Sequence, residues 1–242
     1  MKIDILTLFP EFFSVLRNWS IIGRAINEKK IKIESTNIRD FSRNKHKKVD
    51  DYPFGGGPGM VMTPEPIYRA INSVKNKKSK VVYLSPQGKQ MNQKTVNDLS
   101  KEKHIVLLCG HYEGIDNRII DNYIDEEISI GDYVLTGGEI PAMVLIDSIV
   151  RLLPGVLKSE ESYLDESHYN GLLEYPQYTR PREFNGFSVP KILLSGDHKK
   201  IQEWRYNKSL EATLLKRPDL LENINLGKKK QLLLNNLNDD ID

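Results

Sequence analysis

One segment constrains the fold more than any other: Ser129-Ile-Gly-Asp-Tyr-Val-Leu-Thr-Gly-Gly-Glu-Ile-Pro141. It holds three glycines, a proline and two carboxylates where an apolar strand is expected to lead into a helix. Packing alone would not need so much backbone freedom at such a junction. Glycines at this place let a ligand lie directly against main-chain N–H and C=O groups. The segment therefore predicts a ligand-binding turn.

Two earlier segments have the same character, namely Tyr83-Leu-Ser-Pro-Gln-Gly88 and Leu108-Cys-Gly-His-Tyr-Glu-Gly114. Each follows an apolar run of strand length, over residues 80–84 and 104–108. From residue 80 onward a pattern of strand, loop and helix repeats, and the predicted helices cover residues 92–100, 115–123 and 139–153. Such alternation predicts an α/β fold with a parallel sheet covered on both faces. Ligands of these sheets lie beyond the carboxyl ends of the strands, where the glycine-bearing loops fall.

The first part of the chain predicts two strands, over residues 3–8 and 31–38, and helical segments over residues 10–17, 21–28 and 64–74. Residues 39–60 are different, because they are first basic and then rich in glycine. A loop of this length inside a compact domain is usually functional or disordered. The run Gly55-Gly-Gly-Pro-Gly59 lacks the pattern of a nucleotide or dinucleotide phosphate loop. A substrate loop and a flexible turn therefore both remain open for it.

Composition excludes several classes of protein. The 242 residues contain one cysteine, Cys109, so neither a disulfide framework nor a cysteine zinc cluster is expected. The sequence has no run of 18 apolar residues, so we expect no membrane span. His111 has no histidine or cysteine partner at metal-binding spacing, so no metal site is predicted. A net charge of +2 neither requires nor excludes a nucleic-acid partner. We expect a soluble, cytoplasmic protein.

The character of the sequence changes after Pro154-Gly155. Residues 159–171 are polar and acidic without a sustained apolar period, which is typical of a linker. Beyond them strand signals vanish, and helices are predicted over residues 201–215 and 229–237. Asp197 is expected to cap the start of the earlier helix, so Lys199 and Lys200 lie in its first turn, where they oppose the helix dipole. Contact with an RNA backbone is therefore a better explanation for these basic residues than local stability. We therefore expect a main domain over residues 1–158, a linker over 159–171 and a small all-α domain over 172–242.

Several polar residues in the loops allow two interpretations. Glu113 and Glu139 are expected at helix starts, where the backbone dipole favours a carboxylate regardless of function. Asp132 lies between Gly131 and Tyr133 inside a ligand loop and is harder to explain as a helix cap. Arg151 ends an otherwise apolar helix, where it either caps the last carbonyl groups or directs its charge into a site.

Taken together, the motifs resemble those of the bacterial tRNA (guanine-N(1)-)-methyltransferases, knotted methyltransferases of the SPOUT superfamily. The resemblance covers nearly the whole chain, in order. It rests on Leu-Thr-Leu-Phe-Pro, Gly-Gly-Gly-Pro-Gly-Met, Tyr-Leu-Ser-Pro-Gln-Gly, Cys-Gly-His-Tyr-Glu-Gly, Ile-Gly-Asp-Tyr-Val-Leu-Thr-Gly-Gly-Glu and Gly-Leu-Leu-Glu-Tyr-Pro-Gln-Tyr-Thr-Arg-Pro. No single motif would be specific, but the combination is.

The resemblance implies a deep trefoil knot formed by the three loops, and S-adenosylmethionine as the methyl donor. It also implies a dependence on magnesium, a homodimer with the site at the subunit interface, and a helical domain that binds the tRNA anticodon stem-loop. The expected reaction is methylation of N1 of the guanosine on the 3′ side of the anticodon. The residues expected to bind the donor are Tyr83, Leu84, Ser85, Pro86, Gly110, Tyr112, Glu113, Gly114, Ile130, Gly131, Asp132, Tyr133, Val134, Leu135, Gly137, Gly138 and Pro141.

The resemblance also assigns catalytic residues. Guanine N1 carries a proton that must leave as the methyl group arrives, so a general base is needed. The family uses an aspartate directly before Ser-Phe, but this chain has Glu166 before Ser-His, so either Glu166 or the preceding Asp165 is expected to be the base. Arg151 matches the family arginine that stabilises charge on O6 of the base. Arg24, His46 and Asp50 fall at family positions near the substrate RNA.

Two alternatives remain. The chain could be a knotted methyltransferase acting on another RNA, such as rRNA, although the helical C-terminal domain in family register argues against this. It could also be a non-catalytic RNA-binding protein that has kept the fold, which the departure at Glu166 favours. Loss of activity in a Glu166→Ala variant would separate an enzyme from the second alternative.

Overall fold

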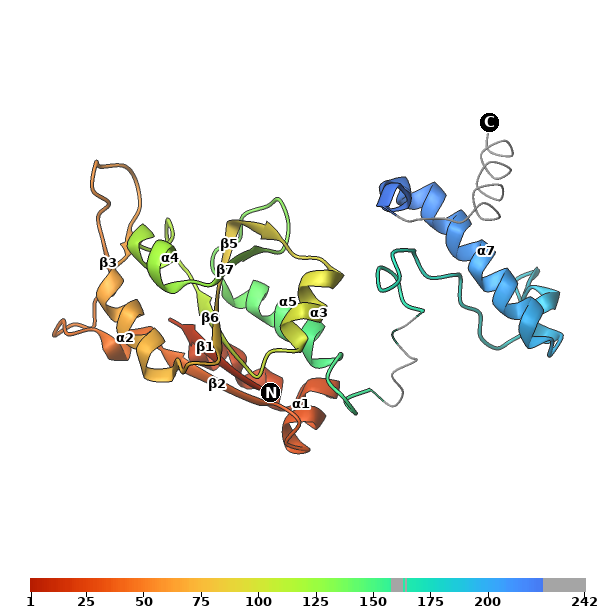
Figure 1. Cartoon of the computed structure of the whole chain (residues 1–242), viewed down its shortest axis with the longest axis horizontal. Helices are drawn as coiled ribbons and strands as arrows, with labels where there is room; N and C mark the ends of the chain where they lie inside the picture. The colour runs from red at the N-terminus through yellow and green to blue at the C-terminus, as the bar shows by residue number, and fades with distance from the viewer. Residues whose placement is uncertain (158–162, 164, 224–242) are drawn as a thin grey trace. The chain divides into compact units, whose positions relative to one another are not determined.

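The computed structural model describes residues 1–157, 163 and 165–223. The chain forms two compact units, Met1–Lys158 and Ser159–Asp242, and each is described separately (Figure 1). Among the described residues no helix is long and apolar enough to cross a membrane.

The first unit is built on a five-stranded sheet with the order β2-β1-β6-β5-β7. All four neighbouring pairs are parallel. The central strands are buried on both faces, as their nearly continuous apolar sequences predict. The strands are β1 (Lys2–Thr7), β2 (Lys32–Asn37), β5 (Ser79–Gln90), β6 (His104–Cys109) and β7 (Glu126–Ser129).

Helices cover both faces of this sheet (Figure 1). One face packs against the 3-10 helix η1 (Pro10–Arg17), α1 (Ser20–Asn27), α3 (Gln93–Ser100) and α5 (Glu139–Val150). The other packs against η2 (Ile38–Phe41), α2 (Pro64–Val74) and α4 (Asn117–Tyr123). The predicted α/β fold with a parallel sheet covered on both faces is confirmed.

The first glycine-bearing segment differs from its prediction. A strand over residues 80–84 followed by a loop was expected, but β5 continues to Gln90. Its pairing with β7 shifts register between Leu84 and Lys89, so residues 85–88 form a bulge within the strand. An ideal Cβ on Gly88 would lie 2.5 Å from the carbonyl carbon of Glu127. Only glycine lets the bulge lie this close to β7, and residues 85–88 have no partner in the described pairing with that strand.

The long segment between η2 and α2 is mostly without regular structure. It contains a minimal antiparallel ribbon of β3 (Asp50–Asp51) and β4 (Val61–Met62). The glycine-rich run between these two strands is exposed. The ribbon brings the end of this run back to the sheet, where Met62 bridges to Ile115 in the loop after β6.

The second unit is organised around α7 (His198–Lys216), close to the helix predicted over residues 201–215. Shorter elements accompany it, namely η3 (Lys191–Leu194), η4 (Pro218–Asn223) and a two-stranded hairpin of β8 (Glu183–Phe184) and β9 (Phe187–Ser188). The hairpin was not predicted, although its turn residues Asn185 and Gly186 both have positive φ and form a characteristic hairpin dipeptide. The helix predicted over residues 229–237 lies outside the described residues.

Candidate active site

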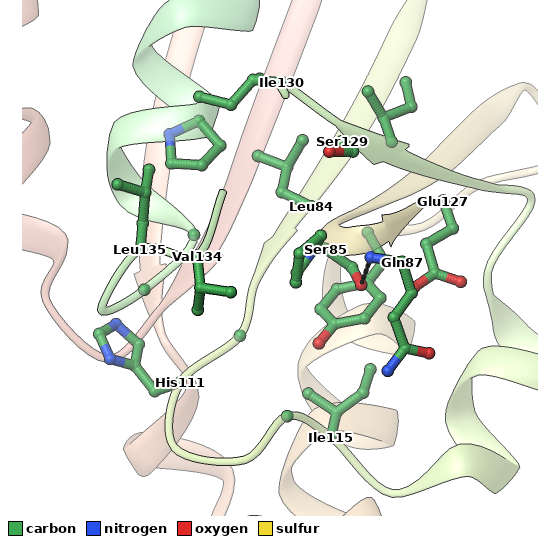
Figure 2. A pocket seen from close by; sticks show the side chains of 18 of the residues that line it. Leu84, Ser85, Gln87, His111, Ile115, Glu127, Ser129, Ile130, Val134 and Leu135 are labelled. Carbon is green, nitrogen blue, oxygen red and sulfur yellow. Dashed lines mark hydrogen bonds between the residues drawn. The ribbon is translucent and has the colours of Figure 1, made fainter. Parts of the chain in front are cut away.

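The three glycine-bearing segments meet at one edge of the sheet. Because β5, β6 and β7 are parallel, their pairing brings Leu84, Cys109 and Ser129 to the same side. A cavity of about 350 Å³ lies there. Figure 2 shows Ser85 from the bulge and Val134 and Leu135 from the loop before α5 around the same hollow.

Sixteen of the 17 residues expected to bind the methyl donor line this hollow. The exception is Asp132, whose side chain is exposed and which is not part of the lining. The hollow is also lined by residues that were not among the expected donor-binding residues, namely Gln87, His111, Ile115, Asn117, Ile120, Glu127, Ile128, Ser129 and Thr136.

The walls of the hollow are main chain packed against main chain. The Gly138 N–H donates to the Gly110 carbonyl at 3.0 Å and so joins the loop before α5 to the end of β6. An ideal Cβ on Gly138 would lie 2.7 Å from Cα of Cys109. A side chain at this position would therefore force two backbone segments apart. Tyr112, in the loop after β6, has a φ of 59°, an uncommon conformation for a non-glycine residue that is concentrated at functional sites.

Two buried titratable groups, Tyr83 and Cys109, lie beneath these loops. Burial, reinforced by the nearby Glu127 carboxylate, raises the pKa of Tyr83 to about 12, so its hydroxyl stays protonated. Burial, with a smaller effect of Glu139, raises the pKa of the Cys109 thiol well above its ordinary value. A buried neutral thiol is a poor nucleophile, so Cys109 belongs to the core.

Glu127 provides an acceptor in the same hollow. Its Oε1 atom is buried and, within the described residues, makes no hydrogen bond. Buried polar atoms normally have a partner, so this oxygen is available to an N–H or O–H group of a ligand. Figure 2 places Glu127 beside Gln87, on the side of the hollow opposite His111.

Arg151 and Arg24 are not in this hollow. Arg151 is the C-cap of α5, and its backbone N–H donates to the Asp147 carbonyl at 3.4 Å. Gly138 is the N-cap of the same helix, so the two residues are separated by about 20 Å at 1.5 Å per residue. Arg24 donates from Nη2 to the Val156 carbonyl at 3.1 Å, just beyond Arg151 in the chain. The two arginines therefore belong to the end of α5 opposite the hollow.

The two candidate bases lie in the second unit. Asp165 is exposed and Glu166 is half-buried. The segment that follows them is attached to α7, because the Leu173 N–H donates to Oγ1 of Thr213 at 2.9 Å. The choice between Asp165 and Glu166 stays a prediction.

The other two RNA-binding candidates of the first unit, His46 and Asp50, lie on the long loop and its ribbon. His46 is exposed, whereas Asp50 pairs with Met62 in the ribbon. The Met62 N–H donates to the Gly114 carbonyl at 2.9 Å, and the Glu113 N–H donates to the Met60 carbonyl at 2.9 Å. These bonds attach the end of the glycine-rich run to the loop after β6, which lines the hollow.

The sequence did not reveal that the buried carboxylate of Glu139 bonds to His111 and Thr7 at the rim of the hollow. Nε2 of His111 lies 2.7 Å from Oε2 of Glu139, and Oγ1 of Thr7 donates to the other carboxylate oxygen at 2.6 Å. The residues joined are 28 and 132 positions apart, so no local pattern could have indicated the contact. No group of three or more metal-ligating side chains occurs in the part of the chain that the structure describes.

Comparison with known proteins identifies the family. Residues 1–223 match the model of the family described as tRNA (Guanine-1)-methyltransferase TrmD. A "tRNA (guanine-N(1)-)-methyltransferase" of Clostridium novyi is 61% identical over 235 residues, which cover 97% of each chain. A protein of the same name from Alkaliphilus oremlandii is 60% identical over 242 residues, again with 97% of each chain covered. One from Ruminiclostridium cellulolyticum is 60% identical over 227 residues, which cover 93% of this chain and 97% of the relative. The chain therefore belongs to the tRNA (guanine-N(1)-)-methyltransferase family.

Proposed function

We propose that this chain transfers a methyl group from S-adenosylmethionine to N1 of the guanosine on the 3′ side of the tRNA anticodon. Membership of the family makes it an enzyme that methylates guanine in tRNA, and such an enzyme uses a methyl donor of this type. The observation that carries the assignment of the donor site is the hollow at the carboxyl ends of β5, β6 and β7. We further infer a cytoplasmic location, because tRNA is the substrate.

The hollow suits a donor that carries amine and hydroxyl groups beside a flat base. Glycine-lined main chain lets a ligand approach closely, as at Gly110 and Gly138. The unpartnered oxygen of Glu127 would accept a hydrogen bond from an amine or a hydroxyl group. The apolar side chains of Leu84, Ile130 and Leu135 would cover the faces of the base. When bound, the donor supplies an electrophilic methyl group.

The remaining chemistry falls to groups that act on guanine. A carboxylate, Glu166 or Asp165, would accept the N1 proton, and a cation would offset the charge that builds on O6. We assign the cation to Arg151 and keep both carboxylates as candidates. The magnesium dependence and the trefoil knot that the resemblance implies both stay part of the proposal.

The position of Arg151 supports a site shared between two copies of the chain. About 20 Å of α5 separates it from the hollow of its own chain, which is too far for a side chain to reach. Exposed apolar side chains indicate where a second copy would pack. Phe12 and Val15 project from η1, and Ile140 and Val144 from α5, each with at least 38% of its surface exposed. The elements η1 and α5 lie against each other, so these side chains belong to neighbouring surfaces.

The second unit supplies a surface suited to RNA. Phe184 and Phe187 face each other across the hairpin and are 66% and 81% exposed. Arg180 and Arg182, just before the hairpin, are also exposed. Exposed aromatic rings stack on unpaired bases and arginines contact phosphates, so this hairpin fits the unpaired nucleotides of an anticodon loop.

The test is methyl transfer from labelled donor to unmodified tRNA that bears guanosine after the anticodon. Loss of the general base should lower the rate by about 10²–10⁴-fold. We expect this loss in one of the variants Glu166→Ala and Asp165→Ala, and not in Glu174→Ala, which removes a nearby carboxylate of the same unit. A wild-type chain that binds donor and tRNA but transfers nothing would overturn the catalytic proposal and favour the RNA-binding alternative.

A mixing experiment tests the shared site. Arg151→Ala keeps the hollow intact, whereas Gly138→Ala damages the hollow and keeps the arginine. If each site combines the hollow of one copy with the arginine of the other, exchange of subunits between these two impaired variants will raise activity in the mixed dimers. No recovery after exchange, with mixed dimers demonstrated by mass spectrometry, would place Arg151 outside the site.

A further inference from the structure

The buried carboxylate of Glu139, at the rim of the hollow, accepts more side-chain hydrogen bonds than the start of a helix requires. A glutamate in the first turn of a helix is stabilised by the dipole even when it is exposed. Glu139 is instead only 5% exposed, and each of its carboxylate oxygens has its own hydrogen-bond donor. A buried carboxylate is costly unless it is satisfied in this way. Its burial therefore indicates a role beyond starting α5.

The direction of the hydrogen bonds follows from the chemistry of the groups. An ionised carboxylate only accepts, so Nε2 of His111 must carry a proton. The Thr7 hydroxyl accepts from the Phe9 N–H at 2.9 Å and donates to Oε1 of Glu139. The carboxylate thus joins the end of β1, the start of α5 and the loop after β6. The Phe9 ring lies edge-on to the imidazole, with ring centroids 5.0 Å apart.

Glu139 does not line the hollow, but His111 does. The imidazole lies so close to Gly137 that a Cβ there would overlap it, and His111 and Gly137 also form an isolated β-bridge. The His111 ring is therefore enclosed between Gly137, Phe9 and the carboxylate. Fixing this ring fixes two of the three loops of the hollow relative to each other, namely the loop after β6 and the loop before α5.

We propose that Glu139 is a positioning residue for the methyl donor, which acts through His111 to hold these two loops at the spacing that the donor requires. This inference rests on the proposed function, because it assumes that the donor binds in the hollow. It assigns a role to Thr7 as well, since the hydroxyl anchors the carboxylate to β1. Loss of the carboxylate would leave the hollow in place but less well ordered.

The structure offers a matched control at the opposite end of the same sheet. There Nε2 of His104 lies 2.7 Å from Oδ2 of Asp4, and both residues are buried. Nδ1 of His104 lies 2.7 Å from Oγ of Ser79. This second histidine–carboxylate pair has the same length and similar burial, but it does not line the hollow. His104→Ala should therefore lower stability without changing donor affinity.

The experiment measures donor affinity by calorimetry and the steady-state constants for Glu139→Ala, His111→Ala and the double variant. Removal of a charge-assisted hydrogen bond of this kind should raise Kd and KM for the donor about tenfold or more, with kcat at saturating donor within about threefold of wild type. The double variant should bind no more weakly than the weaker single variant, because both changes break one contact. Glu139→Gln should recover part of the affinity, since an amide can bond both Thr7 and a tautomerised His111.

Each outcome decides the proposal. If wild type binds no donor, or if Gly138→Ala binds it normally, the proposed donor site fails, and this inference fails with it. If wild type binds and Glu139→Ala binds equally well, or if the two single effects add fully in the double variant, only the positioning role fails. Should Glu139→Ala not fold, Thr7→Val replaces it, with a smaller rise in Kd expected; unchanged affinity would then reject the role. A loss of affinity in His104→Ala would show that destabilisation alone explains the effect.

Discussion

Replacing Gly138 by alanine adds one methyl group at a close backbone contact in the wall of the hollow. The φ of Gly138 is −82°, which alanine adopts freely, so the substitution causes no conformational strain of its own. The new Cβ would lie 2.7 Å from Cα of Cys109, whereas ordinary contacts begin at 3.4 Å. The two segments must therefore separate by about 0.7 Å, since the two nearest atoms, Cα of Cys109 and N of Gly110, both belong to the main chain.

The magnitude follows from two effects. Overpacking of this kind costs about 1–3 kcal/mol. A separation of about 0.7 Å also stretches the 3.0 Å hydrogen bond from the Gly138 N–H to the Gly110 carbonyl beyond bonding distance, which costs about 1 kcal/mol more. The free energy of unfolding of the first unit should fall by about 2–4 kcal/mol. Donor affinity should fall by more than about tenfold, because the wall of the hollow moves by a sizeable fraction of an atomic radius.

The assay combines denaturant unfolding, followed by circular dichroism, with calorimetric titration of the donor. Gly155→Ala is the matched control in the same unit. Its φ of 72° imposes a left-handed cost of about 1–2 kcal/mol, but within the described residues its Cβ would meet the Lys30 side chain alone, at an ordinary 3.5 Å. This control should lose stability and keep full donor affinity. If Gly138→Ala were as stable as wild type and bound donor normally, the close contact between the two loops would be refuted.

Three further predictions concern the groups beneath the loops. Gly110→Ala should weaken donor binding, because its Cβ would lie 2.8 Å from the Tyr83 hydroxyl; adding Tyr83→Leu should recover part of the affinity, and calorimetry that shows no recovery would contradict this explanation. The pKa of Tyr83 is raised to about 12 in the folded chain, so the unfolded chain ionises first, near pH 10. Between these two pH values wild type should lose up to about 3 kcal/mol of unfolding free energy relative to Tyr83→Phe, as measured by denaturant titration at each pH. Cys109 should resist alkylation in the folded chain and react after denaturation, because its thiol is buried and neutral; rapid labelling of the folded chain, detected by mass spectrometry, would show the opposite.

Local signals explain what could be predicted from the sequence. Apolar runs followed by glycines indicated strands that end in ligand loops, and parallel pairing then requires those loops to meet. The order of the strands could not be predicted, because β1 pairs with β6 across about a hundred residues. The continuation of β5 through its bulge was also missed, since Pro86 and Gly88 are ordinarily turn residues.

The contacts of individual side chains were harder to predict from the sequence. Glu139 looked like a residue stabilised by the helix dipole alone, because Thr7 and His111 are distant in sequence. Arg151 matched a family position, but only the length of α5 shows that it lies far from the hollow of its own chain. The hairpin with the sequence Phe184-Asn-Gly-Phe187 did carry a recognisable turn signal, but it was not predicted, because its two strands are only two residues long.

The place of β7 at the edge of the sheet has a consequence for dynamics. Among the residues that the structure describes, this four-residue strand pairs with β5 alone, yet the loop that closes one side of the hollow begins directly after it. Edge strands open locally without unfolding the strands inside the sheet. A ligand that contacts all three loops binds only the form in which β7 is paired with β5. By mass action, the ligand therefore stabilises this paired form. The exchange of amide hydrogens along β7 should therefore slow when the hollow is filled, while exchange in β1 and β6 should remain governed by global unfolding.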